Sequence, residues 1–314
     1  DGIRDRSPSR GLGDVYKRQT GDSVGHLMLK LRADDLSWNP AEFSFMYSLG
    51  QGLMHCLYMR TAFYIHNERF EPSEAIHTLK KRGITIFSTV PTAYRMILAS
   101  SDFKEKPNLE NLRLCVSSGE TLPPETYREW KARFGCDIID GLGVSELQKF
   151  CVNLDREPIK PGSTGKVLPG YVMEIHDFDG KPIPNNEVGR VAIRDDCPGL
   201  FVEYRKMPKA WKENHINGWY YTGDLGRFDE DGYFWFVGRA DDVIISAGYR
   251  IGPFEVESAL IEHPAVAESA VVASPDDVRG EIVKAFVILA PDYVASDELM
   301  ISLQDHVRTT TAPY

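Results

Sequence analysis

Residues 218–257 read GWYYTGDLGRFDEDGYFWFVGRADDVIISAGYRIGPFEVE, and the interpretation of the whole chain starts from this stretch. Aromatic and polar residues alternate on both sides of an acidic cluster that ends at Gly232. Alternation with a period of two is typical of half-buried strands, and an acidic cluster followed by glycine is typical of a hairpin turn. Residues 219–228 and 233–237 are therefore predicted to be paired antiparallel strands.

Asp224 and Arg239 are the charged residues of this hairpin that suggest a binding site. Asp224 follows a glycine, which lets a ligand approach the backbone, and one carboxylate can accept both hydroxyls of a ribose. Asp224 could equally be a turn aspartate that caps its own backbone. Arg239 is followed by Asp241 and Asp242, which by themselves indicate a solvated charge cluster. The hairpin alone leaves both interpretations open.

Three linked motifs resolve this ambiguity by their order and spacing. They are YTGDLG at 221–226, DEDGYFWFVGRADDVI at 229–244 and SAGYRIGPFEVE at 246–257. Together they resemble the AMP-forming acyl-CoA synthetases of the adenylate-forming (AMP-binding) superfamily, and the resemblance runs from about Leu31 to the end of the chain. GRADDVIISAGYRIGP and VRGEIVKAFVILA are closest to the medium-chain and benzoate-type acyl-CoA ligases. Three linked motifs are a far more specific signal than a single glycine pattern.

The resemblance implies an α/β fold in which a large domain precedes a small one, both of them partial. Residues 21–240 would be an N-terminal AMP-binding domain with a parallel sheet, and a β-barrel-like subdomain would occupy about 160–240. Residues 241–314 would be an α+β C-terminal lid. Residues 1–20 have no hydrophobic period and look like a linker or adapter-derived tail, with a natural disordered tail as the alternative.

Local patterns support this division. Strand, helix and strand follow one another twice in the first half, which is typical of a parallel sheet with a ligand crevice at the carboxyl ends of its strands. An order of helix, strand, strand and helix is predicted for the last part of the chain. The predicted helices are 71–81, 91–98, 123–134, 253–262 and one from 296, and the predicted strands are 83–90, 112–116, 136–140, 267–273 and 283–289.

Two loops are expected at that crevice. In the resemblance, the hydroxyl of Ser145 touches the α-phosphate and Glu146 helps to hold Mg²⁺, for which oxygen ligands are suited. By themselves these two residues would also suit a helix cap with an acidic first turn. Leu142 stands where many relatives carry an aromatic residue, a departure similar to that of benzoate-type ligases. The nucleotide contacts implied by the resemblance are Ser118, Gly119, Glu120, Thr121, Asp140, Gly141, Leu142 and Gly143.

The resemblance also assigns roles around the boundary between the two domains. Asp224 and Arg239 would hold the ribose, and Asp241 would be the hinge about which the lid turns. Arg250 would approach the adenylate phosphate or the acyl carboxylate as a catalytic residue. A polar, solvated side chain tolerates the backbone rotation that a hinge requires.

Coenzyme A would be bound by the lid. Arg279 would meet a phosphate of the CoA nucleotide, although a surface salt bridge with Asp276 or Asp277 is the alternative. Upstream, the aromatic segment at 45–47 would either line the acyl pocket or belong to the core. The residues expected to edge the pantetheine tunnel are Ala247, Gly248 and Tyr249, and those of the aromatic segment are Phe45, Met46 and Tyr47.

Composition limits the other classes of function. The chain has 314 residues, of which 42% are hydrophobic, and a formal net charge of −10. This charge argues against a nucleic-acid partner, since phosphate neutralisation needs clustered Lys and Arg. No apolar run reaches the length of a membrane span. The five cysteines are scattered without a CxxC motif, which predicts packing roles in a reducing compartment and a cytoplasmic protein.

The function expected from the resemblance is ATP-dependent activation of a small carboxylic acid, medium-chain or aromatic, to acyl-AMP and its transfer to CoA. ATP or AMP, CoA and Mg²⁺ are the implied cofactors. The family's Thr/Ser/Gly-rich phosphate loop and its late catalytic lysine have no match in these 314 residues. We therefore expect that the 314-residue chain does not catalyse the reaction. An adenylating ligase that loads a carrier protein and a non-catalytic nucleotide-binding module are the alternatives.

Overall fold

The computed structural model describes most of the chain after the predicted tail. The tail at 1–20, Met46, Gly248 and Asp277 lie outside the described residues, and of Gln51 and Arg250 only the backbone is described. What the sequence predicts for those parts stays a prediction. The described residues are 28–45, 47–66, 70–100, 108–154, 158–197, 199–247, 249–276 and 278–311.

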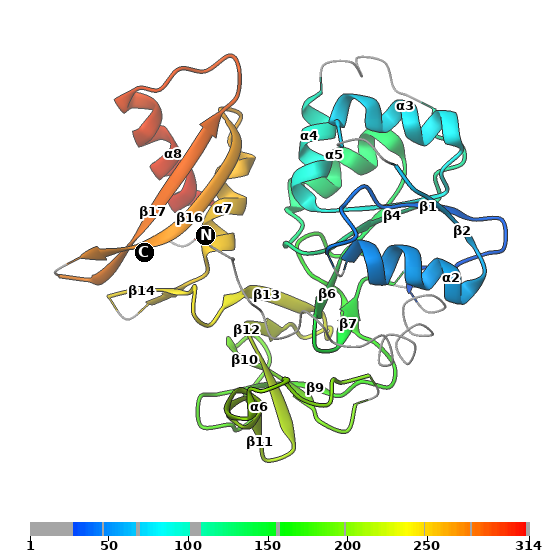
Figure 1. The fold of residues 1–314 in the computed structure, drawn as a ribbon. Helices are drawn as coiled ribbons and strands as arrows, with labels where there is room; N and C mark the ends of the chain where they lie inside the picture. Colours follow the sequence, from blue (N-terminus) through cyan, green and yellow to red (C-terminus); the bar gives the residue numbers. More distant parts are fainter. Residues whose placement is uncertain are drawn as a thin grey trace.

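A five-stranded parallel sheet forms the first layer (Figure 1). Its strand order is β2-β1-β3-β4-β5, and α3, α4 and α5 pack beside one another next to it. The strands are β1 (Leu36–Trp38), β2 (Ala62–Tyr64), β3 (Ile86–Thr89), β4 (Leu114–Ser117) and β5 (Ile138–Ile139). The helices of the first part are η2 (Tyr47–Met54, π-helical), α2 (His55–Met59), α3 (Pro72–Arg82), α4 (Pro91–Ala99) and α5 (Pro124–Phe134).

Strand alternation divides the core between the two faces of this sheet. Phe87, Cys115 and Ile138 belong to the cluster under the helices, which also contains Trp130 and Tyr94. The neighbouring strand residues face the other way and pack into the core of the antiparallel part, because successive side chains of a strand point to opposite faces. Those residues are Ile86, Leu114, Val116 and Ile139.

The helices of this layer begin and end where the sequence predicts. Each of α3, α4 and α5 carries proline in its first turn, and α3 and α5 end at Gly83 and Gly135 in the left-handed region. The strands are shorter than predicted, and the segment 136–140 contributes only β5. The prediction of strand–helix–strand units in a parallel sheet is confirmed.

Two antiparallel sheets follow. The larger has the order β11-β12-β10-β9, with β13 paired to β12, and the smaller has the order β6-β7-β8. The predicted hairpin is confirmed, with its second strand running on to Arg239. The larger sheet contains β9 (Met173–His176), β10 (Gly189–Arg194), β11 (His215–Ile216), β12 (Trp219–Phe228) and β13 (Phe234–Arg239), with α6 (Pro208–Asn214) beside it; the smaller contains β6 (Gly141–Val144), β7 (Gln148–Val152) and β8 (Lys166–Val167).

Residues 141–144 correct one expectation, because they form a strand rather than a loop. Gly143 pairs with Lys149, and a Cβ at Gly143 would lie 2.5 Å from the carbonyl oxygen of Gln148. The glycines that suggested a loop are therefore the residues that let β6 approach β7 so closely.

The last part of the chain is a separate four-stranded sheet with two helices. Its order is β15-β14-β17-β16, and α7 and α8 pack against it around Ile244, Leu260 and Leu303. In Figure 1 it stands beside the parallel sheet, and α7 contacts β13 and α5. The predicted order holds, although β14 and β15 had not been expected. The elements are β14 (Ile244–Ser246), β15 (Tyr249–Ile251), α7 (Pro253–Glu262), β16 (Val266–Asp276), β17 (Gly280–Leu289) and α8 (Asp297–Thr310).

Two predictions from composition concern the packing role of the cysteines and the length of the apolar segments. All five cysteines are free and buried, as their predicted packing role requires. Within the described ranges, none of the helices has the length and apolarity needed to cross a membrane.

Gly165 is the point where the two antiparallel sheets meet. Its φ is +90°, and a Cβ would lie 2.0 Å from the backbone carbonyl of Val152 on β7. On its other side, its carbonyl accepts a hydrogen bond of 2.7 Å from the N–H of Phe234, which is fully buried on β13. A side chain at residue 165 would therefore separate β7 from the hairpin.

Gly165→Ala should destabilise the fold by about 3 kcal/mol or more, because a left-handed alanine and an overpacked backbone contact both cost free energy. Gly232→Ala is the matched control, since its φ is +78° but its Cβ would meet nothing within 4 Å. That variant should lose only about 1–2 kcal/mol. Urea denaturation measures both, and equal losses would contradict the close approach at Gly165.

Candidate active site

A cavity of about 860 Å³ lies where strands of the parallel sheet end beside the β12–β13 hairpin. Twelve of the predicted site residues line it together, although they come from segments more than a hundred residues apart in the chain. Asp140 is not among them, and it is buried at the end of β5. The twelve are Ser118, Gly119, Glu120, Thr121, Gly141, Leu142, Gly143, Ser145, Glu146, Asp224, Arg239 and Asp241.

Asp224 and Arg239 face each other across the hairpin. They are register partners on β12 and β13, and the Arg239 guanidinium donates to Asp224 Oδ1 at 3.2 Å and to the Thr222 carbonyl at 2.9 Å. A Cβ at Gly223 would lie 2.7 Å from this guanidinium, so the glycine makes room for the arginine. Asp224 lies within a strand, and its interpretation as a turn cap is therefore wrong.

Asp224 keeps one oxygen without a partner. Its side chain is almost fully buried, yet Oδ2 has no hydrogen-bond partner within the described part of the chain. Burial raises the pKa of the Asp224 carboxyl, and the nearby Arg239 charge opposes this effect. A buried acceptor of this kind costs free energy unless a donor reaches it, and a sugar hydroxyl is such a donor.

Arg239 also reaches outward to Asp241, whose Oδ1 lies 3.3 Å from the guanidinium Nε. The Asp241 side chain is 75% exposed. One guanidinium thus joins the buried acid of the cavity to the exposed acid at its rim.

Ser145 and Glu146 lie in the turn between β6 and β7. No described helix begins there, so the helix-cap alternative is wrong. The Tyr204 hydroxyl donates to Glu146 Oε1 at 2.9 Å and lies 3.2 Å from the Tyr220 hydroxyl. The Phe201 N–H also donates to the Glu146 carbonyl at 2.9 Å. Both the backbone and the carboxylate of Glu146 are therefore held in place.

The two tyrosines are site residues that sequence reasoning missed. Tyr220 alternates with Thr222 and Asp224 along β12, and all three line the cavity, so the strand period could have identified it. Tyr204 precedes α6 and carries no local signal for a contact with Glu146.

Glu146 is the residue that could hold a cation here. Across the described residues, no group of three or more His, Cys, Asp or Glu side chains is placed to bind a metal ion. Mg²⁺ is commonly held by one or two carboxylates together with substrate phosphates and water. A single oriented carboxylate at this cavity fits that mode of binding.

Lys149 is the third residue that was missed, and it is buried near enough to Asp140 for the charges of the two groups to interact, so we call the two a buried pair. Both side chains are less than 5% exposed. Burial raises the pKa of Asp140 to about 6, with Lys149 opposing it, and burial lowers the pKa of Lys149 to about 8, with Asp140 opposing it. The Lys149 amine donates to the Ser117 carbonyl at 2.9 Å. Lys149 is followed on β7 by the buried run Phe150, Cys151 and Val152, where a lysine is unexpected.

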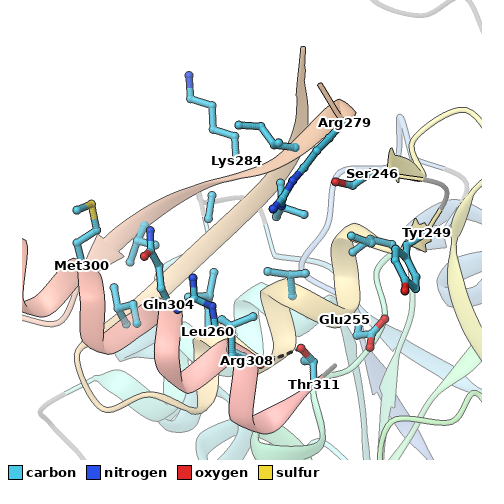
Figure 2. Close-up of a pocket in the computed structure, with 18 of the residues that line it drawn as sticks. Ser246, Tyr249, Glu255, Leu260, Arg279, Lys284, Met300, Gln304, Arg308 and Thr311 are labelled. Atoms are coloured by element: carbon cyan, nitrogen blue, oxygen red, sulfur yellow. Dashed lines mark hydrogen bonds between the residues drawn. The ribbon is translucent and has the colours of Figure 1, made fainter. Parts of the chain in front are cut away.

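The residues expected to contact CoA lie on another surface. Ala247, Tyr249 and Arg279 line a groove of about 820 Å³ in the C-terminal part, between its sheet and α8. Figure 2 shows Tyr249 and Arg279 near one end of this groove and Met300 and Gln304 of α8 farther along it. The expected catalytic role of Arg250 cannot be placed here, because its side chain lies outside the described residues.

Two smaller expectations concern Arg279 and the aromatic segment. One oxygen of the Asp276 carboxylate accepts the backbone N–H groups of Val278 and Arg279.

The Tyr47 hydroxyl donates to the carbonyls of Thr89 and Val116, where β3 and β4 end, and Phe45 is 60% exposed. Tyr47 therefore packs against the carboxyl ends of β3 and β4, on the side of the sheet where the cavity lies.

Two family models show the class of protein to which this chain belongs. The chain belongs to the AMP-binding enzyme family, because the model for AMP-binding enzymes matches residues 15–204. The model for the AMP-binding enzyme C-terminal domain matches residues 255–314.

Named relatives agree with this family. The chain is 45% identical to the acyl-coenzyme A synthetase ACSM3, mitochondrial, of Rattus norvegicus, over 92% of this chain and 51% of the relative. It is 43% identical to the uncharacterized acyl--CoA ligase YtcI of Bacillus subtilis (strain 168), over 88% of this chain and 50% of the relative. The chain thus spans about half the length of the curated relatives it matches.

Solved structures show the same fold. The anthranilate CoA ligase AuaEII in complex with anthranoyl-AMP has a TM-score of 0.87 and 35% identity, over 95% of this chain and 58% of that one. A benzoate CoA ligase from Burkholderia xenovorans LB400 has a TM-score of 0.86 and 30% identity, over 95% of this chain and 59% of that one.

Lys149→Met should destabilise the protein by about 3 kcal/mol, because it leaves the buried Asp140 carboxylate without a compensating charge. Adding Asp140→Asn should recover most of this loss, since the double variant buries no charge. Urea denaturation of the two single variants and the double variant measures the coupling. Additive losses in the double variant would show that the two groups do not act as a pair.

Proposed function

We propose that this family member is an AMP-forming acid–thiol ligase. It would convert a carboxylic acid and ATP to acyl-AMP and pyrophosphate, and then acyl-AMP and CoA to acyl-CoA and AMP. The observation that carries the proposal is Asp224, whose Oδ1 pairs with Arg239 while its buried Oδ2 keeps an unused acceptor at a cavity lined by the nucleotide motifs. The family match and the CoA ligases of the same fold support it.

In the first half-reaction, a carboxylate oxygen attacks the α-phosphorus of ATP and the bond to the pyrophosphate oxygen breaks. Asp224 and Arg239 would hold the ribose, and residues 118–121 and 140–143 would contact the adenine. The Ser145 hydroxyl would contact the α-phosphate. Glu146, oriented by Tyr204, would hold Mg²⁺. When bound, Mg²⁺ neutralises negative charge that develops on the phosphate oxygens.

In the second half-reaction, the CoA thiol loses its proton, its sulfur attacks the acyl carbonyl, and AMP leaves with the bonding electrons. The C-terminal lid of residues 241–314 would turn about Asp241 to present Ala247, Gly248, Tyr249 and the catalytic Arg250. Arg279 would bind a CoA phosphate. Ala247, Tyr249 and Arg279 line a groove apart from the proposed nucleotide cavity, which supports a change of orientation between the two steps.

The proposed substrate is a small carboxylic acid, medium-chain or aromatic. Two solved relatives are ligases named for anthranilate and benzoate, which supports an aromatic acid. The five free thiols support a reducing compartment, and we place the protein in the cytoplasm. In this proposal, residues 21–240 form the AMP-binding domain, with its β subdomain at about 160–240.

Asp224→Asn should weaken AMP binding by about tenfold or more, because an amide is a poorer acceptor for ribose hydroxyls than a carboxylate and pairs less well with Arg239. Isothermal titration calorimetry on the chain measures the affinity. Asp231→Asn is the control, since this residue is exposed at the tip of the same hairpin and its carboxylate pairs with Lys160. Equal AMP affinity in the Asp224→Asn variant and the unsubstituted protein would overturn the ribose-binding role.

Arg279→Ala distinguishes a CoA ligase from an enzyme that loads a carrier protein. In the native protein, carboxylate-dependent exchange of pyrophosphate into ATP should persist, while acyl-CoA formation should fall by about tenfold, as expected for loss of one phosphate contact. The exchange assay reports the first step and thioester formation reports the second. Unchanged thioester formation would exclude a CoA contact by Arg279.

A further inference from the structure

The nucleotide loop, residues 118–121, is held at both of its ends by the same buried pair. At the beginning of the loop, the Lys149 amine donates to the Ser117 carbonyl at 2.9 Å. At its end, the Leu122 N–H donates to Asp140 Oδ2 at 3.4 Å. The four residues between these contacts all line the cavity.

Lys149 reaches the Ser117 carbonyl from β7, the strand of the small sheet that pairs with β6. It lies on β7 opposite Gly143, and the missing side chain of that glycine lets β6 and β7 lie close together. Asp140 immediately precedes β6. The pair therefore connects three parts of the site: the strand β4 that leads into the nucleotide loop, the strand β6 that lines the cavity, and β7 behind it.

The pair does not stabilise the fold in its charged form at neutral pH. Burial shifts the pKa of Asp140 up to about 6 and the pKa of Lys149 down to about 8, so the interior favours the neutral form of each group. Replacing a buried pair with apolar groups of similar size is often neutral or stabilising. The presence of a charged pair in the interior therefore calls for a role other than stability.

The other titratable groups around the pair stay neutral over the same pH range. Tyr47 on η2 and Cys115 on β4 have pKa values raised well above their ordinary values by burial. Burial also raises the pKa of Cys151 on β7 to about 12. Among the described residues around the pair, Asp140 and Lys149 are therefore the groups that carry charge between about pH 6 and 8.

We propose that Lys149 is a positioning residue, whose ammonium group acts with the Asp140 carboxylate to fix both ends of the nucleotide loop and so sets the affinity for the adenine nucleotide. Lys149 does not line the cavity and acts through the Ser117 carbonyl. The proposal rests on the function proposed above, and it adds a dependence of nucleotide affinity on the protonation of one buried amine.

The first test compares the pH dependence of AMP affinity with that of stability. AMP is a suitable probe because its phosphate is already largely ionised at pH 7. The affinity for AMP should fall by about fivefold or more between pH 7 and 9. Lys149 loses its proton over this range, and its hydrogen bond to the Ser117 carbonyl is then no longer strengthened by the positive charge.

Stability should change in the opposite direction over the same range. Because the pKa of Lys149 is lower in the folded protein than in the unfolded chain, the unfolded chain binds more protons above about pH 8, and the free energy of unfolding rises with pH. This rise is measured relative to the variant that carries both Asp140→Asn and Lys149→Met, which lacks both groups. A purely structural role would make affinity and stability fall together.

The second test uses two matched substitutions. Lys149→Met should weaken AMP binding by about tenfold at pH 7 and remove the decline toward pH 9. Lys166→Met should change neither, since Lys166 lies on the neighbouring strand β8 against the Tyr233 ring. The measurement on the unsubstituted protein does not depend on whether the variants fold.

The outcomes separate this inference from the proposed function. If the protein binds AMP with an affinity independent of pH, or if Lys149→Met binds AMP as tightly as the unsubstituted protein, the positioning role is overturned and the proposed function stands. If the unsubstituted protein does not bind AMP, the proposed function is overturned together with this inference.

Discussion

The pairing of Asp224 with Arg239 is the interaction on which the rest of the site depends. It joins the two strands of the hairpin where they line the cavity, and it fixes one buried carboxylate oxygen while leaving the other without a partner in the described structure. In the proposed function, this pair would hold the ribose beside the residues that line the cavity from the parallel sheet. Gly223 makes the pairing possible, because any side chain there would meet the guanidinium.

Two buried carboxylates, one lining the cavity and one beside it, are only partly satisfied. Asp140 and Asp224 both keep an oxygen without a hydrogen-bond partner in the described structure. Such atoms cost free energy in the absence of a ligand, since burial removes their water without replacing it. The apolar clusters under the helices and beneath the hairpin carry the stability that this arrangement requires.

Sequence reasoning predicted the parts of this structure that depend on local periodicity. The hairpin, the proline-started helices and the order of the C-terminal elements all follow from patterns within about ten residues. It missed β6 because a glycine-rich segment has no strand pattern, although glycine is what the close approach to β7 requires. It missed Lys149 and Tyr204 because their roles depend on residues 32 and 58 positions away. Contacts between residues so far apart in the sequence depend on tertiary packing, which local sequence patterns do not predict.

The proposed two-step chemistry can be understood from the way Arg239 is shared. Its guanidinium contacts Asp224 inside the cavity and Asp241 at the exposed rim, where the C-terminal part begins. Of the two Arg239 contacts, a rotation of the backbone at Asp241 would break the outer one, which is exposed and contributes little to stability. The inner contact with Asp224 lies within the strand pairing of β12 and β13 and would persist. In such a motion the ribose would stay bound while the groove that carries Arg279 changed its position relative to the cavity.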